Sequence, residues 1–359
     1  MQCRSRSYRK SIMKVLFGGH IKIGNQEASL FKAFTELRVD LSIINFEDHF
    51  KLSFLNRAFN KAGFTKVPRY FGVRSLNENL IKQALTSRPD FILLFKPILI
   101  LPETVRRLAR VAKVYSWYPD YILFPKTCSS YFYEAIPLYD CHFSFSPENA
   151  NGLLEYGAKK SIFLPCAADI SCHMPVKVTE EEKKSLGADI VFVGTFVNEE
   201  RFWYLEKLCQ EGYNLKIYGN SWRKCAPNSC LVKTGCIQFR QVCCKEMSKV
   251  FNASKIVLSF LRKHNKDVLT CRSYEIPACG AFMLHERTPE AVKLFREDQE
   301  ASFFDSYEEM KKKIDFFLKN EDLRLKVAQA GYKKIVEGGH LFTNRIQDII
   351  TAHHKLSRG

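Results

Sequence analysis

The chain has 359 residues, of which 46% are hydrophobic, and a formal net charge of +17 at pH 7. This length accommodates two ordinary α/β domains, each with its own core, and a single compact domain of this size would be unusual. The longest apolar stretch, Phe91 to Pro102, is interrupted by Lys96 and Pro97. It is shorter than the ~20 residues that a membrane-spanning helix needs, so the sequence predicts no transmembrane segment.

Residues 1–12 are basic and no apolar segment follows them, which argues against a secretory signal and predicts a disordered extension. Thirteen cysteines without an export signal favour a reduced, cytoplasmic protein, one that could also lie peripherally at the inner membrane face. Five of them are close together in sequence: Cys225, Cys230, Cys236, Cys243 and Cys244. Their gaps are wider than those of zinc ribbons, so we interpret them as small buried thiols, with a metal site as the alternative.

From Met13 to Pro165, short apolar runs alternate with amphipathic segments, a pattern typical of a mainly parallel sheet flanked by helices. The expected strands are Lys14–Phe17, Leu41–Asn45, Phe91–Phe95, Val114–Tyr118 and Cys141–Phe145. The expected helices are Gln26–Leu37, Leu76–Thr86, Pro102–Val111 and Pro147–Tyr156. These elements form a predicted N-terminal domain over residues 13–165.

Residues 166–186 lack apolar periodicity and become highly charged, which predicts an interdomain linker. A second α/β series over residues 187–335 has expected strands at Asp189–Gly194, Leu215–Tyr218, Ile256–Ser259 and Ala281–Leu284. The last portion is expected to be helical at Tyr307–Leu318, Asp322–Val336 and Thr343–Lys355. Residues 336–359 then form a separate C-terminal helical segment.

Three candidate sites follow predicted strands. Asp120 lies just past the end of a strand, where α/β proteins place ligands, although it could equally begin a turn. Gly194 lets the backbone approach a phosphate, and Arg201 near the start of the next helix could neutralise that phosphate. Trp222 could stack on a nucleobase or cover the core as a half-buried lid.

The most informative stretch is residues 270–286, TCRSYEIPACGAFMLHE. Thr270 is expected to cap a helix that carries Arg272 and Glu275 in its first turns, and Gly280 is expected to end it in a left-handed conformation. An apolar strand follows. Glu275 then lies near a strand edge, where a ribose can reach it.

This stretch resembles the donor-nucleotide motif of GT-B glycosyltransferases of the spore-maturation-protein-like (CgeB-like) group, Arg-x-x-Glu-Ile-Pro-Ala-x-Gly, through Arg272, Glu275, Ile276, Pro277, Ala278 and Gly280. The resemblance implies an α/β GT-B fold, with two Rossmann-like domains facing across a cleft and a final helix that crosses back onto the first domain. It implies a nucleotide-sugar donor, a UDP- or GDP-sugar, and neither cofactor nor metal. In related retaining families two carboxylates eight positions apart contact the donor sugar and the ribose, and these positions hold Asp267 and Glu275 here.

The same resemblance implies further roles. The loop Gly18–Gly24 would lie beneath the donor, where His20 could contact substrate and Lys22 could stabilise a leaving phosphate, although both could be ordinary loop residues. Asp120 is the candidate base if the enzyme inverts, and no dedicated base is needed if it retains. His340 and Arg345 match a pattern common near the end of this group, which we interpret as helix-packing or interdomain residues.

Charge gives the clearest indication of the acceptor. Residues 1–165 hold 24 Lys and Arg against 13 Asp and Glu, whereas residues 166–359 hold 31 against 25. A positive first half attracts anionic partners, such as an anionic glycan, a lipid-linked acceptor at a membrane face, or nucleic acid. No nucleic-acid-binding motif is present, which makes nucleic acid the least favoured of these.

The sequence therefore predicts a glycosyltransferase that moves a sugar from a nucleotide diphosphate donor to a glycan or other cell-envelope acceptor. The alternative is a non-catalytic basic protein on the same scaffold that binds nucleic acid or another anionic polymer. The intact run from Arg272 to Gly280 favours the enzyme.

Overall fold

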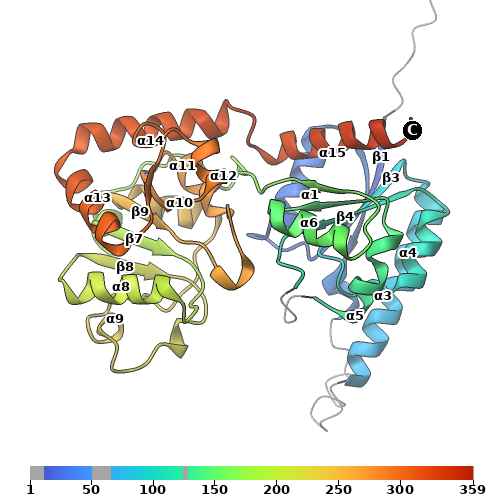
Figure 1. Ribbon diagram of the computed structural model, residues 1–359, viewed down its shortest axis with the longest axis horizontal. Helices are drawn as coiled ribbons and strands as arrows, with labels where there is room; N and C mark the ends of the chain where they lie inside the picture. Colours follow the sequence, from blue (N-terminus) through green and yellow to red (C-terminus); the bar gives the residue numbers. More distant parts are fainter. Residues whose placement is uncertain (1–11, 51–65, 124–127, 359) are drawn as a thin grey trace, which may run out of the picture. The chain divides into compact units, whose positions relative to one another are not determined.

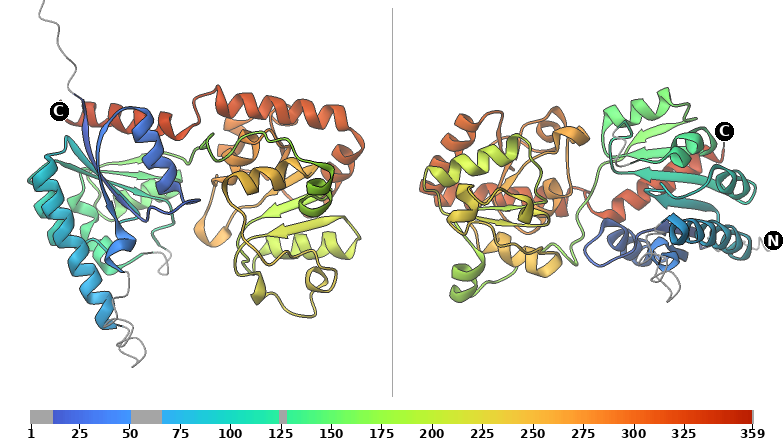
Figure 2. Two further views of the ribbon diagram at one scale, coloured as in Figure 1. Left: turned by 180° about the vertical axis from the view of Figure 1, so that it is seen from behind. Right: turned by 90° about the horizontal axis from the view of Figure 1, so that it is seen from below.

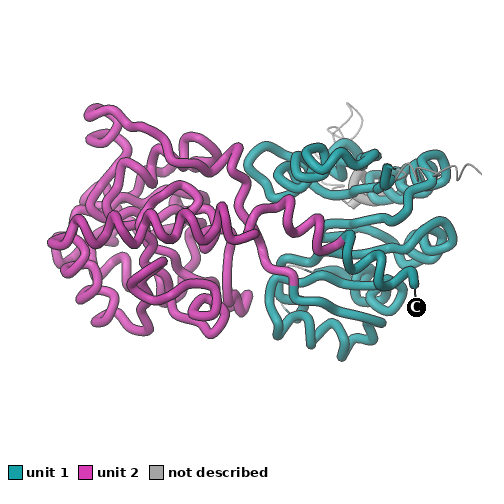
Figure 3. Tube along the Cα trace, turned by 90° about the horizontal axis from the view of Figure 1, so that it is seen from above, with its two compact units in different colours: residues 1–163, 350–359 teal, residues 164–349 magenta. Residues whose placement is uncertain are grey.

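The computed structural model describes residues 12–50, 66–123 and 128–358. The chain divides into two compact units, which are coloured separately in Figure 3. Unit 1 comprises residues 1–163 and 350–359, and unit 2 comprises residues 164–349. Nearly all of the expected N-terminal extension lies outside the described residues. So do residues 51–65, the first part of a stretch from Lys51 to Arg88 in which Lys and Arg far outnumber Asp and Glu and which we expect to attract an anionic acceptor or membrane surface.

Unit 1 is built on a parallel six-stranded sheet in the order β2-β1-β3-β4-β5-β6, of which Figure 1 labels β1, β3 and β4. Its strands are β1 (Lys14–Gly19), β2 (Asp40–Asn45), β3 (Phe91–Phe95), β4 (Lys113–Tyr118), β5 (Cys141–Ser144) and β6 (Ser161–Phe163). All five strands expected from the sequence are present. The sixth, β6, was not expected, because three residues are too few to show an alternating pattern.

The helices of unit 1 are α1 (Gln26–Glu36), α3 (Lys66–Ser87), α4 (Pro102–Ala109), α5 (Ser130–Ala135) and α6 (Pro147–Glu155), with short 3-10 turns η1 (Phe46–His49) and η2 (Ile136–Leu138). Helix α3 begins ten residues before the expected Leu76. Its first turns contain Pro68 and Gly72, both poor helix formers, which conceal the helix from pattern analysis.

Both faces of the first sheet are covered. Leu16, Leu94 and Val114 belong to one hydrophobic cluster with buried residues of α3, α4 and α5. On strands whose side chains alternate, their neighbours point to the opposite face. There Phe17 packs on α1, and the Tyr115 hydroxyl lies 3.0 Å from Nδ1 of His353. His353 belongs to the last helix, α15 (Phe342–Leu356), whose final residues are part of unit 1.

Unit 2 has a parallel five-stranded sheet in the order β11-β10-β9-β7-β8. Figure 2 gives two further views of the ribbon. Its strands are β7 (Ile190–Val193), β8 (Leu215–Tyr218), β9 (Ile256–Ser259), β10 (Met283–Glu286) and β11 (Ser302–Phe304). Its helices are α7 (Glu180–Leu186), α8 (Glu200–Gln210), α9 (Cys230–Lys233), α10 (Cys244–Asn252), α11 (Arg272–Ala278), α12 (Pro289–Leu294), α13 (Tyr307–Lys319) and α14 (Glu321–Val336), with 3-10 turns η3 (Trp222–Lys224) and η4 (Lys263–Asn265). The four expected strands and the expected final helices are present, and β11 is additional.

Residues 166–186, expected to be a linker, lie within unit 2. Cys166, Asp169 and His173 are buried, and Ala168 pairs through its backbone with Leu341. Up to Thr179 the backbone is irregular and is held by these contacts, and the helix α7 that follows has no buried residue, so neither part shows an apolar period. No helix in the described part of the chain combines the length and hydrophobicity needed to cross a membrane.

Strand order changes direction once in each sheet, between β1 and β3 in unit 1 and between β7 and β9 in unit 2. In open parallel sheets the loops that leave the carboxyl ends of the strands at such a point form ligand sites. The loops in question follow β1 and β3 in unit 1, and β7 and β9 in unit 2. They carry most of the candidate residues from the sequence.

Candidate functional site

Helix α11 carries the Arg272-to-Gly280 motif at the carboxyl edge of the second sheet. Gly280 has φ of 67°, which confirms the expected left-handed end of the helix. The expected cap at Thr270 is wrong, because Cys271 precedes the first helical residue and the Thr270 Oγ1 atom makes no hydrogen bond within the described part of the chain. Instead, the Thr270 backbone N–H donates to Ser273 Oγ at 2.9 Å.

Glu275 is a buried carboxylate with partners on both sides. It is 9% exposed, its Oε2 atom accepts from the Arg272 guanidinium, and its Oε1 atom lies 3.6 Å from Nε2 of His173. Arg272 also donates through Nε to the carbonyl of Val193 at 3.1 Å. The motif is therefore fixed to the carboxyl end of β7. His173 escaped the sequence analysis because it lies in the segment interpreted as a linker.

Gly194 and Gly219 bring two backbones into contact beside this motif. A Cβ atom on Gly219, whose φ is 138°, would lie 2.0 Å from the Gly194 carbonyl oxygen. The Gly194 N–H donates to Tyr218 and its carbonyl accepts from Trp222 Nε1 at 2.8 Å. Trp222 is 2% exposed, so it is a core residue and the expected stacking role is not available to its ring.

Arg201 lies behind the same strand end. It is 7% exposed, and Nη2 donates to the Thr195 carbonyl at 2.8 Å. Burial lowers the pKa of Arg201, while the nearby carboxylates of Glu199, Asp267 and Glu286 raise it. The Arg201 guanidinium thus stabilises the turn after β7 and places a positive charge beside that turn.

Asp267 is held by neighbours in its own loop. Arg262 donates to its carboxylate through Nε at 2.8 Å and through Nη2 at 3.3 Å, and Asn265 Nδ2 donates at 2.6 Å. Its side chain is 7% exposed. Asp267 therefore stabilises the loop between β9 and α11.

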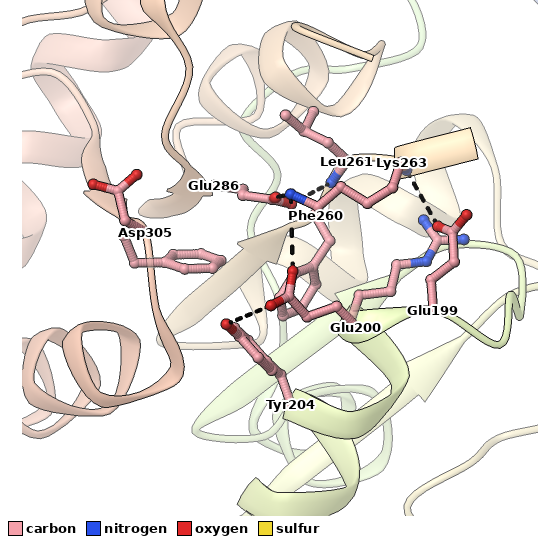
Figure 4. A pocket seen from close by; sticks show the side chains of 10 residues that line it. Glu199, Glu200, Tyr204, Phe260, Leu261, Lys263, Glu286 and Asp305 are labelled. Carbon is pink, nitrogen blue, oxygen red and sulfur yellow. Dashed lines mark hydrogen bonds and ion pairs between the residues drawn. The ribbon is translucent and has the colours of Figure 1, made fainter. Parts of the chain in front are cut away.

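A pocket lined by several charged side chains lies at the start of the loop between β9 and α11 (Figure 4). Glu286, at the end of β10, accepts from the Leu261 N–H at 3.0 Å and pairs with Lys263. Glu199 accepts from the Lys263 N–H at 3.2 Å and binds His264. Burial would raise the pKa of Glu199, but the hydrogen bonds from His264 and Lys263 outweigh it and lower that pKa.

An exposed aromatic side chain lies at the same edge of the sheet. Phe239 is 43% exposed, has φ of 49°, and has the Arg223 guanidinium 5.9 Å from its ring centre. Its neighbour Arg240 accepts a hydrogen bond from the Gly219 N–H at 2.9 Å, which places this turn beside the paired glycines. Sequence analysis missed Phe239, because it lies in an irregular segment with no periodic signal.

The loop after β1 forms a second candidate site, in unit 1. Asn25 Nδ2 donates to the His20 carbonyl at 3.3 Å, and the Ile21 N–H donates to Asn45 Oδ1 at 3.1 Å. The His20 ring lies edge-on to Phe46 at 5.4 Å. Burial lowers the pKa of His20 and so favours the neutral imidazole. Lys22, further along the loop, is exposed.

Asp120 lies at the same carboxyl edge as His20. It is 8% exposed and binds Lys96 Nζ at 2.5 Å. Lys96 follows β3 and has φ of 46°. The lysine and the aspartate form an ion pair there, which no sequence pattern predicts because the two residues follow different strands.

His340 and Arg345 pack within unit 2. Arg345 Nε donates to the Pro165 carbonyl at 3.1 Å, and Nη2 lies 3.3 Å from His340 Nδ1. Burial, with Arg345 and Lys334 nearby, lowers the pKa of His340 to about 4. These residues secure the start of α15 against the segment at residues 165 and 166.

The five cysteines between residues 225 and 244 do not form one group. Cys225 and Cys236 are buried in the core of unit 2, as expected, whereas Cys243 is exposed. Cys209, 2.9 Å from Cys230 and 3.6 Å from Cys236 between sulfur atoms, lies outside the predicted cluster. Among the described residues no group of three or more His, Cys, Asp or Glu is arranged to hold a metal ion.

Comparison with known proteins gives a family match and a fold. Residues 201–351 match the family described as glycosyl transferase-like. No curated protein sequence matches the chain.

Among solved structures, a glycosyltransferase from Rickettsia africae aligns with a TM-score of 0.63 at 14% identity, covering 97% of this chain and 100% of that one. Sucrose-phosphate synthase from Thermosynechococcus elongatus gives 0.65 at 10%, covering 97% and 100%. Anabaena Alr3699/HepE in complex with UDP-glucose gives 0.61 at 10%, covering 95% and 99%. These likenesses show that the chain has the GT-B fold.

Proposed function

We propose that this chain is a glycosyltransferase that transfers a sugar from a nucleoside diphosphate donor to an anionic glycan or other cell-envelope acceptor. The family match over residues 201–351 and the GT-B fold support this proposal. The observation that carries the proposal is the ion pair between the partly exposed Arg272 and the buried Glu275, fixed to the end of β7 through Val193. It joins a carboxylate and a guanidinium at the edge of the sheet where parallel α/β folds bind ligands.

The two charged groups suit the two polar parts of a nucleotide. Glu275 can accept hydrogen bonds from ribose hydroxyls, and charge-assisted bonds of this kind are stronger than neutral ones. The Arg272 side chain is 28% exposed, which leaves guanidinium N–H groups for a diphosphate. Arg201 adds positive charge from beneath the turn. UDP is the favoured nucleotide, because Anabaena HepE of the same fold binds UDP-glucose.

Phe239 is the proposed contact for the base. Its exposed ring lies at the same carboxyl edge, next to the turn that approaches Gly219 and Gly194. Aromatic rings stack on nucleobases whatever the base, so Phe239 would add affinity without selecting among nucleotides. It takes the place that the sequence suggested for Trp222.

On the acceptor side, His20 is the proposed base if the reaction inverts configuration. An acceptor hydroxyl attacks the anomeric carbon, the bond from that carbon to the diphosphate oxygen breaks, and the hydroxyl proton passes to the neutral imidazole. Asp120, the expected base, is paired with Lys96, so we assign it to positioning that lysine. If the reaction retains configuration, the departing diphosphate can accept the proton. Asp267 then stabilises the loop between β9 and α11, which we propose lies beside the donor sugar.

The proposed acceptor is anionic, because the positive charge of the chain is concentrated in residues 1–165. An acceptor carried on a lipid would bring the protein to an anionic membrane face, which the same charge favours. Nucleic acid remains the partner of the alternative, non-catalytic function.

A thermal-shift panel with UDP, GDP, ADP, CMP and their sugar conjugates tests the donor assignment. A ligand that binds only the native state raises the melting temperature by mass action. We expect UDP and a UDP-sugar to raise it and Glu275→Ala to abolish the rise, while the exposed control Asp322→Ala keeps it. If no nucleotide raises the melting temperature of the wild-type protein, the binding-protein alternative is favoured.

A further inference from the structure

The carboxylate of Glu275 has a basic side chain at each of its two oxygens. Arg272, from the same helix, donates to Oε2, and Nε2 of His173 lies 3.6 Å from Oε1, within ion-pair distance. His173 comes from the irregular segment that precedes α7. The side chains of His173 and Glu275 are 9% and 12% exposed, so water and dissolved ions screen their attraction only weakly.

The backbone around His173 is held by hydrogen bonds of its own. The His173 N–H donates to the Asp169 carbonyl at 2.7 Å, which closes a turn. Ser248 Oγ, from α10, donates to the carbonyl of Cys172 at 3.0 Å. The turn that carries the imidazole is therefore attached to a helix of unit 2, and the fold determines where the ring lies relative to Glu275.

One asparagine joins this segment to the end of α11. Asn252 Oδ1 accepts from the Val176 N–H at 2.8 Å, and Asn252 Nδ2 donates to the carbonyl of Cys279, directly after the helix, at 2.8 Å. The segment that carries His173 and the helix that carries Glu275 are thus bound to the same side chain. Contact between the two residues does not depend on a mobile loop.

A carboxylate that receives two neighbouring hydroxyls must keep both oxygens directed at the sugar. The last torsion of a glutamate side chain has a broad energy minimum, so a partner on one oxygen leaves the carboxylate plane free to turn. A second partner on the other oxygen fixes that plane. Each carboxylate oxygen has two lone pairs, so both oxygens of Glu275 can still accept hydrogen bonds from hydroxyls.

We propose that His173 is a positioning residue that holds the Glu275 carboxylate in the plane that receives both ribose hydroxyls, and so makes the donor site select ribonucleotides over 2′-deoxynucleotides. The proposal rests on the function proposed above for Glu275. Arg272 does not fix the plane by itself, because it donates to Oε2 and, through Nε, to the carbonyl of Val193. A 2′-deoxynucleotide offers one hydroxyl, so it gains less from a fixed carboxylate.

Calorimetric titration with UDP and 2′-deoxy-UDP measures this selection directly. Wild-type protein should bind UDP about 10- to 100-fold more tightly, because 2′-deoxy-UDP loses one hydrogen bond to a charged acceptor. His173→Ala should reduce the ratio to about threefold or less, mainly by weakening UDP, because the carboxylate plane is then free to turn. The control Ile170→Ala, whose side chain in the same segment is 44% exposed, should keep the wild-type ratio.

Two further variants separate positioning from packing. His173→Gln places an amide N–H donor near the position of Nε2, so it should restore most of the ratio. His173→Phe fills similar space without a donor, so it should lose the ratio as His173→Ala does. A purely structural role would weaken both ligands by the same factor and leave the ratio unchanged in every variant.

Normal UDP affinity with an unchanged ratio in His173→Ala would overturn this proposal alone, and so would an equal loss for both ligands. If His173→Ala does not fold, His173→Gln and His173→Phe decide, and equal ratios in these two variants overturn the proposal. Wild-type protein that binds neither nucleotide would overturn the proposed function as well.

Discussion

The two units assemble their candidate sites in different ways. In unit 2 the central pair, Arg272 and Glu275, is three residues apart on one helix. In unit 1 the cluster of His20, Lys96 and Asp120 spans about a hundred residues and is joined by the order of the strands. The family match follows the same division, since residues 201–351 lie almost entirely in unit 2. A local site leaves a readable motif, whereas a site built by topology does not.

This comparison of the two units predicts that the carboxyl edge of the sheet in unit 2 is more sensitive to backbone substitutions than the corresponding edge in unit 1. Gly219→Ala places a methyl group against the Gly194 carbonyl in a strained conformation, so we expect a loss of about 3 kcal/mol or more in the free energy of unfolding. Gly212→Ala is the matched control, because its φ of 83° is also positive but no atom lies within 4 Å of the added carbon. It should cost about 1 kcal/mol.

Chemical denaturation followed by tryptophan fluorescence measures both variants, since Trp203 and Trp222 report on unit 2 and Trp117 on unit 1. Equal losses in the two variants would mean that the contact between the glycines does not determine this edge.

In unit 1 the corresponding sensitivity is to pH. Glu27 lies in the first turn of α1 and is 7% exposed. Burial raises its pKa from the ordinary 4.5 to about 7, so the native state keeps a proton that the unfolded state loses in this window. Wild-type stability is therefore lost as pH rises from 4.5 through 7, by up to about 3 kcal/mol. Glu27→Gln should be more stable than wild type at pH 8 and nearly equal to it at pH 4.5. A difference that does not vary with pH would contradict the burial argument.

Substitutions of two aromatic residues in unit 2 should have different effects, one on stability and the other on nucleotide binding. Trp222→Phe leaves the Gly194 carbonyl without its indole donor and should cost about 1 to 2 kcal/mol in unfolding free energy, with nucleotide affinity nearly unchanged. Phe239→Ala should have the opposite profile, with nucleotide affinity weakened by about 1 to 2 kcal/mol and little change in stability. Calorimetry and thermal unfolding of both variants decide, and a reversed pattern would return the stacking role to Trp222.

The smallest expected effect concerns the basic stretch of unit 1. Reversing Arg57, Lys61 and Lys66 to Glu should weaken association with an anionic acceptor or vesicle by about 1 kcal/mol at physiological salt, because dissolved ions screen long-range attraction between charges. The loss should grow at low ionic strength, and nucleotide binding should be unaffected. Vesicle sedimentation that is unchanged at low salt would remove the charge argument for the acceptor.

The sequence predicted most strands of both units, because buried parallel strands such as Phe91–Phe95 are continuous apolar runs. It also predicted the final helices of the chain, but it did not place the short helices α5, α9 and α12. It missed β6 and β11, which are too short for a pattern, and the early start of α3 behind Pro68 and Gly72. It also interpreted residues 166–186 as a linker, because their packing relies on backbone pairing and single buried side chains.

The candidate residues divide in the same way. Spacing along one helix brought Arg272 to Glu275, but it could not show that Asp267 is bound by Arg262 or that Trp222 is buried. Glu27, Lys96, His173 and Phe239 went unnoticed, since their environments arise from strand order and loop packing. Glu27, for example, is the second residue of α1, and a glutamate at that position is fully explained by a favourable interaction with the helix dipole.

The measurement that tests the account most directly is calorimetric titration of UDP into the wild-type protein, Glu275→Ala, Glu275→Gln and the control Asp322→Ala. We predict that Glu275→Ala weakens binding by about 1.5 to 3 kcal/mol, that Glu275→Gln loses less because its amide oxygen still accepts a hydrogen bond, and that Asp322→Ala binds as wild type does. Nucleotide affinity in a folded Glu275→Ala protein equal to that of the wild type would contradict the assignment of the donor site to α11.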